Sequence, residues 1–202
     1  MTNSQYTSLL IIFVRNPEAG KVKTRLAMEV GNIRALEIYN ELLTRTWMVT
    51  RDIEVKKTVY YTEALVVNDL WDEGGFQKAQ QRGNDIGERM SEALNESFKL
   101  GYKKICLIGS DIYNLESIIL LTAFEQLDNK DVVLGPAEDG GYYLIGMKNF
   151  EPTLFTGKKW SSSTVFHDTL EDINKGGLSV ALLPELIDID TAEDLNKVRD
   201  LI

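Results

Sequence analysis

Short apolar runs alternate along this chain with longer segments in which apolar residues recur every three or four positions. Residues 8–14 form a continuous apolar run, which is typical of a parallel strand covered on both faces. Residues 24–48 carry Leu36, Tyr39 and Leu43 at the spacing of one helix face. The pattern therefore predicts a first strand followed by a long helix.

The alternation continues to the end of the sequence. Further strands are predicted at residues 58–61, 76–80, 104–109, 131–136, 142–147 and 178–183, and further helices at 85–100, 115–127, 162–174 and 191–201. This order predicts an α/β fold, Rossmann-like, with a mostly parallel sheet. The segment Glu138-Asp139-Gly140-Gly141 joins two of the strands and is a hairpin signal, so we expect one late antiparallel element.

Length and composition bound the possible functions. A chain of 202 residues fits one domain over residues 1–202, and 44% hydrophobic residues are enough for a sizeable core. The net charge of −9 argues against nucleic-acid binding, which needs many cations to neutralise phosphates. It also argues against docking on an anionic membrane surface. The oligomeric state is left open.

One cysteine and one histidine exclude an intrachain disulfide, a Cys-rich zinc site and a His-rich metal site within one chain. Metal binding through Asp and Glu oxygens stays open. Residues 1–6 do not resemble a secretion signal, and no apolar run approaches the roughly 20 residues of a membrane helix. We therefore expect a soluble cytoplasmic protein with no membrane partner.

A basic loop follows the first strand. Arg15, Lys21, Lys23 and Arg25 lie within eleven residues that contain one acid, so this loop carries +3 in a chain of −9. Ligands of open α/β sheets bind beyond the carboxyl ends of the strands. A cationic loop that leads into a helix N-terminus at this edge indicates phosphate or nucleotide binding. The alternative is a solvated surface loop, and the glycine-rich P-loop pattern is absent.

Acidic residues follow two later strands. Asp111 comes after strand 104–109, where a carboxylate can hold a divalent cation against diphosphate oxygens, although Asp111 or Asn114 could instead cap the next helix. Asp139, beside Gly140 and Gly141, could act as a base, a metal ligand or an acceptor for a sugar hydroxyl. Ordinary turn chemistry explains the same Asp-Gly pair equally well.

Near the end, Asp188 and Asp190 face one side if the segment is extended. Asp190 or Thr191 also fits a helix cap, with acids in the first helical turn, and a metal role for Asp190 is compatible with capping. Two smaller features concern packing. Gly87, in the first turn of a predicted helix, suggests a ligand close to the backbone, whereas Trp160 fits a core position beside a helix cap.

Five segments together resemble a known family. They read VRNPEAGKVKTRL (14–26), QRGNDIGERM (81–90), IGSD (108–111), GPAEDGGYYLIGM (135–147) and DIDTAEDL (188–195). The combination is similar to bacterial glycosyltransferase-like proteins with the nucleotide-diphospho-sugar transferase (GT-A type) fold, some of which are linked to arsenosugar biosynthesis. The resemblance covers nearly the whole chain.

The resemblance implies a nucleotide-diphospho-sugar donor, a small-molecule acceptor and Mg²⁺ or Mn²⁺. It implies that Lys23 and Arg25 hold the diphosphate, and that Asp111, with Asp190 as a second candidate, binds the metal ion. Asp139 or Glu138 would then deprotonate the acceptor if the enzyme inverts. It further places Gln81, Asp85 and Arg89 near the nucleotide, and Gly140 and Gly141 beside the sugar or acceptor.

The sequence departs from the family pattern at one point and leaves two alternatives. Ile112 and Tyr113 stand where the family has a small residue and a proline, which suggests a different acceptor or a loss of activity. The first alternative is a nucleotidyltransferase resembling guanylyltransferases, which takes a nucleoside triphosphate and a small phosphorylated acceptor. The second is a nucleotide- or sugar-binding protein without catalysis.

Overall fold

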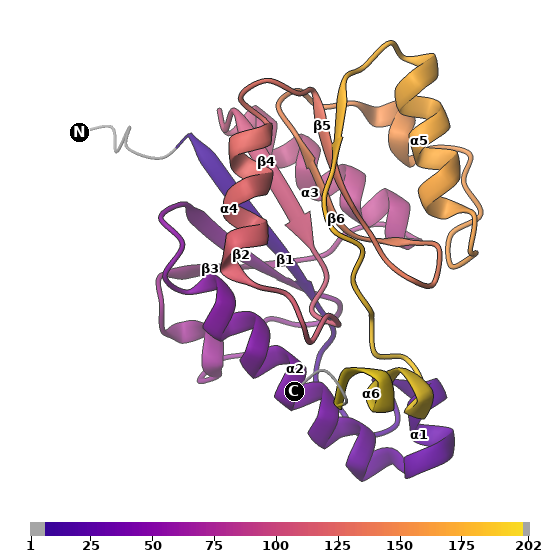
Figure 1. Ribbon diagram of the computed structural model, residues 1–202. Coiled ribbons are helices and arrows are strands. Elements are labelled where there is room, and N and C mark those ends of the chain that lie inside the picture. Colours follow the sequence, from indigo (N-terminus) through magenta and orange to yellow (C-terminus); the bar gives the residue numbers. More distant parts are fainter. Residues whose placement is uncertain (1–6, 200–202) are drawn as a thin grey trace.

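The computed structural model describes residues 7–199, which form a seven-stranded sheet with helices on both faces (Figure 1). The strands are β1 (Ser8–Val14), β2 (Lys56–Tyr61), β3 (Phe76–Gln80), β4 (Lys104–Ile108), β5 (Val132–Pro136), β6 (Tyr142–Met147) and β7 (Val180–Leu182). The helices are α1 (Thr24–Val30), α2 (Asn32–Thr50), α3 (Ile86–Lys99), α4 (Ser117–Gln126), α5 (Val165–Lys175) and α6 (Ala192–Arg199). Two short 3-10 helices, η1 (Leu70–Asp72) and η2 (Pro152–Phe155), lie between them.

The strand order is β3-β2-β1-β4-β6-β5-β7. β6 is antiparallel to β4 and β5, and the other neighbouring pairs are parallel. The predicted α/β fold, with a mostly parallel sheet and one late antiparallel element, is thus confirmed. Because β6 runs in reverse, its first residue, Tyr142, lies at the same sheet edge as the carboxyl ends of β1 and β4.

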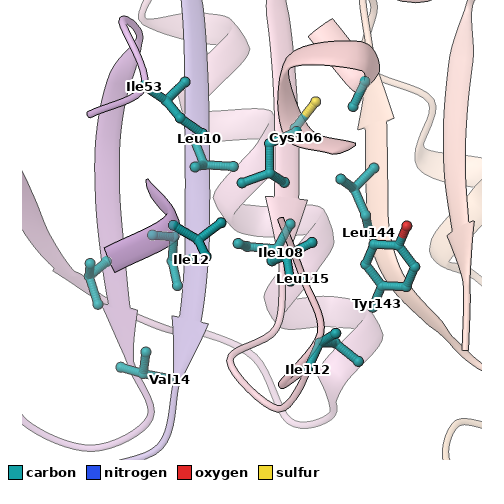
Figure 2. Close-up of a cluster of buried hydrophobic side chains, with 14 of the residues drawn as sticks. Leu10, Ile12, Val14, Ile53, Cys106, Ile108, Ile112, Leu115, Tyr143 and Leu144 are labelled. Carbon is teal, nitrogen blue, oxygen red and sulfur yellow. The ribbon is translucent and has the colours of Figure 1, made fainter. Parts of the chain in front are cut away.

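Side chains of β1 alternate between the two faces of the sheet, as a pleated strand requires. Leu10 and Ile12 point into the core under α2 and α4, where Figure 2 shows them close to Cys106 and Ile108 of β4. Leu9 and Ile11 point to the other face, under α3 and α5. A continuous apolar run is therefore needed because both faces of β1 are covered.

The predicted helix over residues 24–48 is wrong as one element. Gly31 divides it into α1 and α2, with φ 84° and ψ 155°, a conformation outside the helical region. Its N–H closes α1 on the carbonyl of Ala27, while its own carbonyl accepts from Ala35 in the first turn of α2. The periodicity of apolar residues continued across this break, but Gly31 ends the first helix.

Helix starts also differ from the predictions. α4 begins at Ser117 after Glu116, which makes no side-chain cap, so neither Asp111 nor Asn114 caps this helix. α5 begins at Val165 rather than at residue 162. The predicted cap of α6 is confirmed, because Asp194 accepts from Thr191 N–H at 2.8 Å and donates its own N–H to the Thr191 hydroxyl. The expected end of that helix at residues 200–201 lies outside the described residues.

α1 and α6 lie together beyond the carboxyl edge of the sheet (Figure 1). A small core of Leu26, Ile38, Ile189 and Val198 joins them to α2. This core fixes residues 188–191, which lead into α6, opposite the loop that leads into α1. None of the described helices combines the length and apolar character needed to cross a lipid bilayer.

Candidate active site

A cavity of about 870 Å³ opens at the carboxyl edge of the sheet. One wall comes from the segments that follow β1, β2, β3 and β4, and the other from the β5–β6 turn and residues 160–165. A second hollow of about 470 Å³ shares part of this lining and extends toward α1 and residue 190. The predicted site residues that line one or both are Arg15, Lys21, Lys23, Arg25, Gln81, Asp85, Arg89, Asp111, Asp139, Gly141 and Asp190.

The loop after β1 is held in place from two sides. The Asn16 carboxamide accepts the N–H of Glu63 at 2.9 Å and donates to the carbonyl of Ala64 at 2.8 Å. On the other side, the Tyr39 hydroxyl accepts the N–H of Arg15 at 2.7 Å and lies 3.3 Å from the Ser110 hydroxyl. Burial, with the nearby charge of Asp111, raises the pKa of Tyr39, so this phenol stays neutral as a link between the two loops.

Lys23 is the buried cation of the site. Its side chain is 4% exposed, and its ammonium lies 3.0 Å from Asp111 Oδ2 and 3.1 Å from Asp190 Oδ1. Its backbone adopts the left-handed conformation, with φ 46°, which is strained for a residue with a Cβ. Burial alone lowers the pKa of Lys23, but Asp111 and Asp190 together raise it above its ordinary value. Lys23 is therefore charged and joins the loops after β1, β4 and β7.

The other cations of this loop are exposed. Lys21 lies 2.8 Å from Glu18, and Arg25 lies 3.7 Å from Asp190. The Arg15 guanidinium lines both hollows and has no carboxylate partner within residues 7–199. Because α1 has seven residues, its dipole is short, and an anion here would meet mainly these side chains.

Two carboxylates, Asp111 and Asp190, pair with Lys23, and the charge of Lys23 also reaches Asp188. Ile189 N–H donates to the carbonyl of Asp111 at 3.1 Å, and Ile112 forms a β-bridge with Asp188, which fixes the two acidic segments side by side. Burial, together with the charges of Asp139 and Asp190, raises the pKa of Asp188 to about 6, while Lys23 lowers it. The sequence placed Asp188 beside Asp190 but gave it no role.

The donor set suits a hard divalent cation only in part. In the described part of the chain, no three Asp, Glu, His or Cys residues form a group that could hold a metal ion. Mg²⁺ commonly takes one or two protein carboxylates and completes its shell with water and substrate phosphates. Asp111 and Asp190, on either side of one ammonium, fit that arrangement with a phosphorylated ligand bound.

The β5–β6 turn presents Asp139 and Gly141 to the cavity but not Glu138 or Gly140. The Glu138 carboxylate lies 3.0 Å from Lys197 on α6, outside the residues that line the cavity. Gly140 has φ 87°, and a Cβ there would lie 2.1 Å from the carbonyl oxygen of Ser163. Glu138 and Gly140 therefore serve packing, and Asp139, which accepts the N–H of Gly141 at 2.7 Å, is the candidate base.

The segment after β3 forms the far wall. Gln81 is buried, and its Nε2 donates to the carbonyls of Val14 and Tyr60, at 3.1 and 2.9 Å. Its Oε1 is left without a hydrogen-bond partner among the described residues. Asp85 caps α3 by accepting Glu88 N–H at 2.8 Å. Arg89 donates from Nε to the carbonyl of Gly83 at 3.1 Å, which holds the wall in shape.

Trp160 and Tyr142 belong to the cavity wall, and the sequence had not assigned them there. A Cβ on Gly87 would lie 2.2 Å from the indole of Trp160, so the indole rests on the first turn of α3. No ligand is needed to explain Gly87, and Trp160 packs against the core as predicted while it also lines the cavity. A side chain rather than a ligand fills the space at Gly87, and Trp160 is only partly buried. A tryptophan that follows the Gly-Lys-Lys loop gave no signal of this contact.

Comparisons with known proteins bear on the family and the fold of the chain. The family model described as "Uncharacterized protein conserved in bacteria (DUF2064)" matches residues 46–162. A solved structure from Desulfovibrio desulfuricans G20, named "putative nucleotide-diphospho-sugar transferase", is 34% identical with a TM-score of 0.89. The match covers 96% of this chain and 87% of that one. No curated protein matches the chain.

More distant solved structures share the fold. The inositol-1-phosphate CTP transferase from T. maritima is 16% identical with a TM-score of 0.60, over 97% of this chain and 94% of that one. Rv0371C from Mycobacterium tuberculosis H37Rv, solved in complex with manganese, is 14% identical with a TM-score of 0.55, over 96% and 98%. At these identities the likeness shows the fold alone.

Proposed function

The chain belongs to the bacterial family described as DUF2064, and from the geometry of its cavity we propose that it transfers a sugar from a nucleotide-diphospho-sugar to a small-molecule acceptor. The observation that carries the proposal is the pairing of cations with carboxylates at one sheet edge. Arg15, Asp111 and Asp139 line both hollows, and Lys23 lines the second one, paired with Asp111. The name of the 34% identical Desulfovibrio protein supports this choice of donor.

The cations would bind the diphosphate and neutralise it as it leaves. Charge develops on the diphosphate when the glycosidic bond breaks, and fixed positive groups lower the energy of that state. Arg15 is suited to direct contact, because no carboxylate partner among the described residues competes for it. Lys23 is charged and held in place by Asp111 and Asp190, so it supplies a positive group that needs little reorientation.

The remaining groups would select the nucleotide and activate the acceptor. The unpaired Oε1 of Gln81 is a buried acceptor at the cavity wall, which suits an N–H of a nucleobase. Asp139 lines the same cavity and would accept a proton from the acceptor hydroxyl. A divalent ion held by Asp111 and Asp190 would add positive charge on the diphosphate. Asp85 and Arg89 would shape the nucleotide wall.

Ile112 and Tyr113, where the chain departs from the family pattern, are accommodated by packing. Ile112 is 3% exposed in the core, and Tyr113 packs under the guanidinium of Arg45 at 5.5 Å. Asp111 still lines the cavity beside them. The departure from the family pattern therefore does not remove the acidic group. The arsenosugar link of the resembled family stays a prediction.

The second candidate is nucleotidyl transfer from a nucleoside triphosphate. The shared fold with the CTP transferase from T. maritima favours it, since the sheet edge that holds the cavity is common to both functions. The two candidates differ in their products. Sugar transfer releases a nucleoside diphosphate, whereas nucleotidyl transfer releases pyrophosphate.

A donor panel tests the proposal. The protein, with Mn²⁺ or Mg²⁺, is incubated with diphospho-sugars and with nucleoside triphosphates, and nucleoside diphosphate and pyrophosphate are measured separately. We expect diphosphate release from a diphospho-sugar, lost in Asp111→Asn and kept in Asp52→Asn, an exposed acid between α2 and β2 that lines neither hollow. Pyrophosphate release would assign the second candidate instead. Binding without either product would leave only a binding function.

A further inference from the structure

The cavity has two chemically different halves. The half formed by the segments after β1 and β2 carries Arg15 and Lys21 together with polar side chains of the same segments. The other half is lined by Trp160, Tyr142 and Ile86, with Met90 and Val165 between them. Asp111 and Asp139 line the same cavity. A ligand that spans the cavity must therefore present an anion at one end and an apolar face at the other.

The aromatic half is built rather than incidental. The Trp160 indole is fixed because the first turn of α3 has a glycine beneath it, where a Cβ would lie 2.2 Å from the ring. The next residue, Ser161, has φ 62°, a strained conformation for a residue with a side chain, and it also lines the cavity. Tyr142 contacts α3, because its hydroxyl lies 3.9 Å from the sulfur of Met90.

An exposed apolar side chain extends this wall. Ile86 is 39% exposed at the first turn of α3, although the inner face of that helix is packed in the core. Ile86 and Trp160 together present an apolar surface to the cavity, bordered by the carboxylates of Asp85 and Asp139. The one cation on this side, among the residues described, is Arg89, whose Nε is bonded to the carbonyl of Gly83.

We infer that this half is a subsite for the uncharged sugar ring of the donor, an assignment that rests on the proposed function. The C–H face of a sugar ring packs on an aromatic side chain, and its hydroxyls donate to carboxylates such as Asp139. A phosphorylated or carboxylated group would instead meet two acids and an apolar surface, which disfavours it. The nucleobase is then left to the polar half, where Gln81 has its unpaired acceptor.

Binding measurements with and without the sugar test the subsite. Affinities for UDP and UDP-glucose, and for GDP and GDP-mannose, are measured by calorimetry in the presence of Mn²⁺. In Trp160→Ala we expect the diphospho-sugar to lose roughly 3- to 10-fold in affinity, the range of one aromatic contact, and the diphosphate to change less than about twofold. Trp160→Phe keeps a ring above Gly87 and should restore most of the loss.

Trp47→Phe is the matched control, because Trp47 is a partly buried tryptophan outside the cavity, stacked under Arg51 at 4.6 Å. It should leave all four affinities unchanged. An equal loss for diphosphate and diphospho-sugar in Trp160→Ala overturns the subsite, because the ring would then hold the base or only support the fold. No loss for either ligand also overturns it. A wild-type protein that binds none of the four contradicts the proposed function itself.

Discussion

Lys23 lends itself to a quantitative test, because one substitution removes the charge that joins three loops. Lys23→Met keeps an unbranched apolar stem in the buried channel and deletes the ammonium that lies 3.0 and 3.1 Å from two carboxylates. The strained backbone at φ 46° is the same in both proteins, so its cost cancels in the comparison. What changes is that the negative charges of Asp111 and Asp190 lose the positive charge that balances them.

The size of the effect follows from burial. Removing one partner of a fully buried pair costs about 3–5 kcal/mol. Here the lysine side chain is 4% exposed, but Asp111 and Asp190 are 45% and 40% exposed and can turn partly to water. We therefore expect a loss of about 1–3 kcal/mol in the free energy of unfolding. For a chain of this length that corresponds to a fall of roughly 3–10 °C in melting temperature.

The contribution of Lys23 to the free energy of unfolding depends on pH in a definite direction. The pKa of Lys23 is raised above the model-compound value of 10.5, so the folded state binds this proton more tightly than the unfolded state. The stabilisation is fully present below pH 10.5 and is lost only as the pH rises beyond it. The difference between wild type and Lys23→Met should therefore be the same at pH 7 and pH 9.

Urea or thermal unfolding of both proteins measures the difference. Lys21→Met is the matched control, because Lys21 belongs to the same loop and also pairs with two acids, yet its side chain is 54% exposed. It should cost clearly less than Lys23→Met, because water screens an exposed ion pair. Equal losses for the two variants, or a neutral Lys23→Met, would refute the view that Lys23 is the buried link between the loops.

Three further predictions concern the same site. Asp188→Asn should raise the free energy of unfolding at pH 7 by about 1 kcal/mol, after allowance for the partial exposure of this side chain, because burial raises the pKa of Asp188 to about 6. The gain should vanish below about pH 4, and urea unfolding at both pH values measures the difference. Gly87→Ala should destabilise by about 1–3 kcal/mol through overlap with Trp160, whereas Gly109→Ala, with no atom within 4 Å of the added Cβ, should cost clearly less in the same assay. Mn²⁺ alone should raise the melting temperature of Lys23→Met more than that of wild type, since this variant frees the carboxylates of Asp111 and Asp190 from the ammonium. Equal shifts would contradict a metal role for Asp111 and Asp190.

Much of the fold could be read from the sequence because the strands are buried on both faces. A run such as residues 8–14 has few other stable placements than a central strand, and the Asp139-Gly140 pair marks the reversed strand by its turn chemistry. The break at Gly31 was missed because apolar spacing continues across it, while one residue at φ 84° ends the helix. Local geometry overrides periodicity there.

The site was predicted unevenly for a physical reason. Residues that closely follow strands, such as Arg15 and Asp111, line the cavity, since strand ends meet at one edge. The contact between Lys23 and Asp190 joins positions 167 residues apart, and nothing in the local sequence specifies it. Trp160 reaches the cavity through its contact with Gly87 in the first turn of α3, a position 73 residues earlier that the local sequence does not specify.

The central claim is that the diphosphate of a nucleotide binds between the basic loop and Asp111. Its most direct test is a crystal structure of the protein with Mn²⁺ and the nucleoside diphosphate that binds most tightly in calorimetry. The account predicts phosphate oxygens at hydrogen-bond distance, about 3 Å, from Arg15 or Lys23, and the base beside Gln81. A diphosphate bound elsewhere, or no nucleotide bound at a concentration of about 10 mM, far above typical substrate affinities, would contradict it.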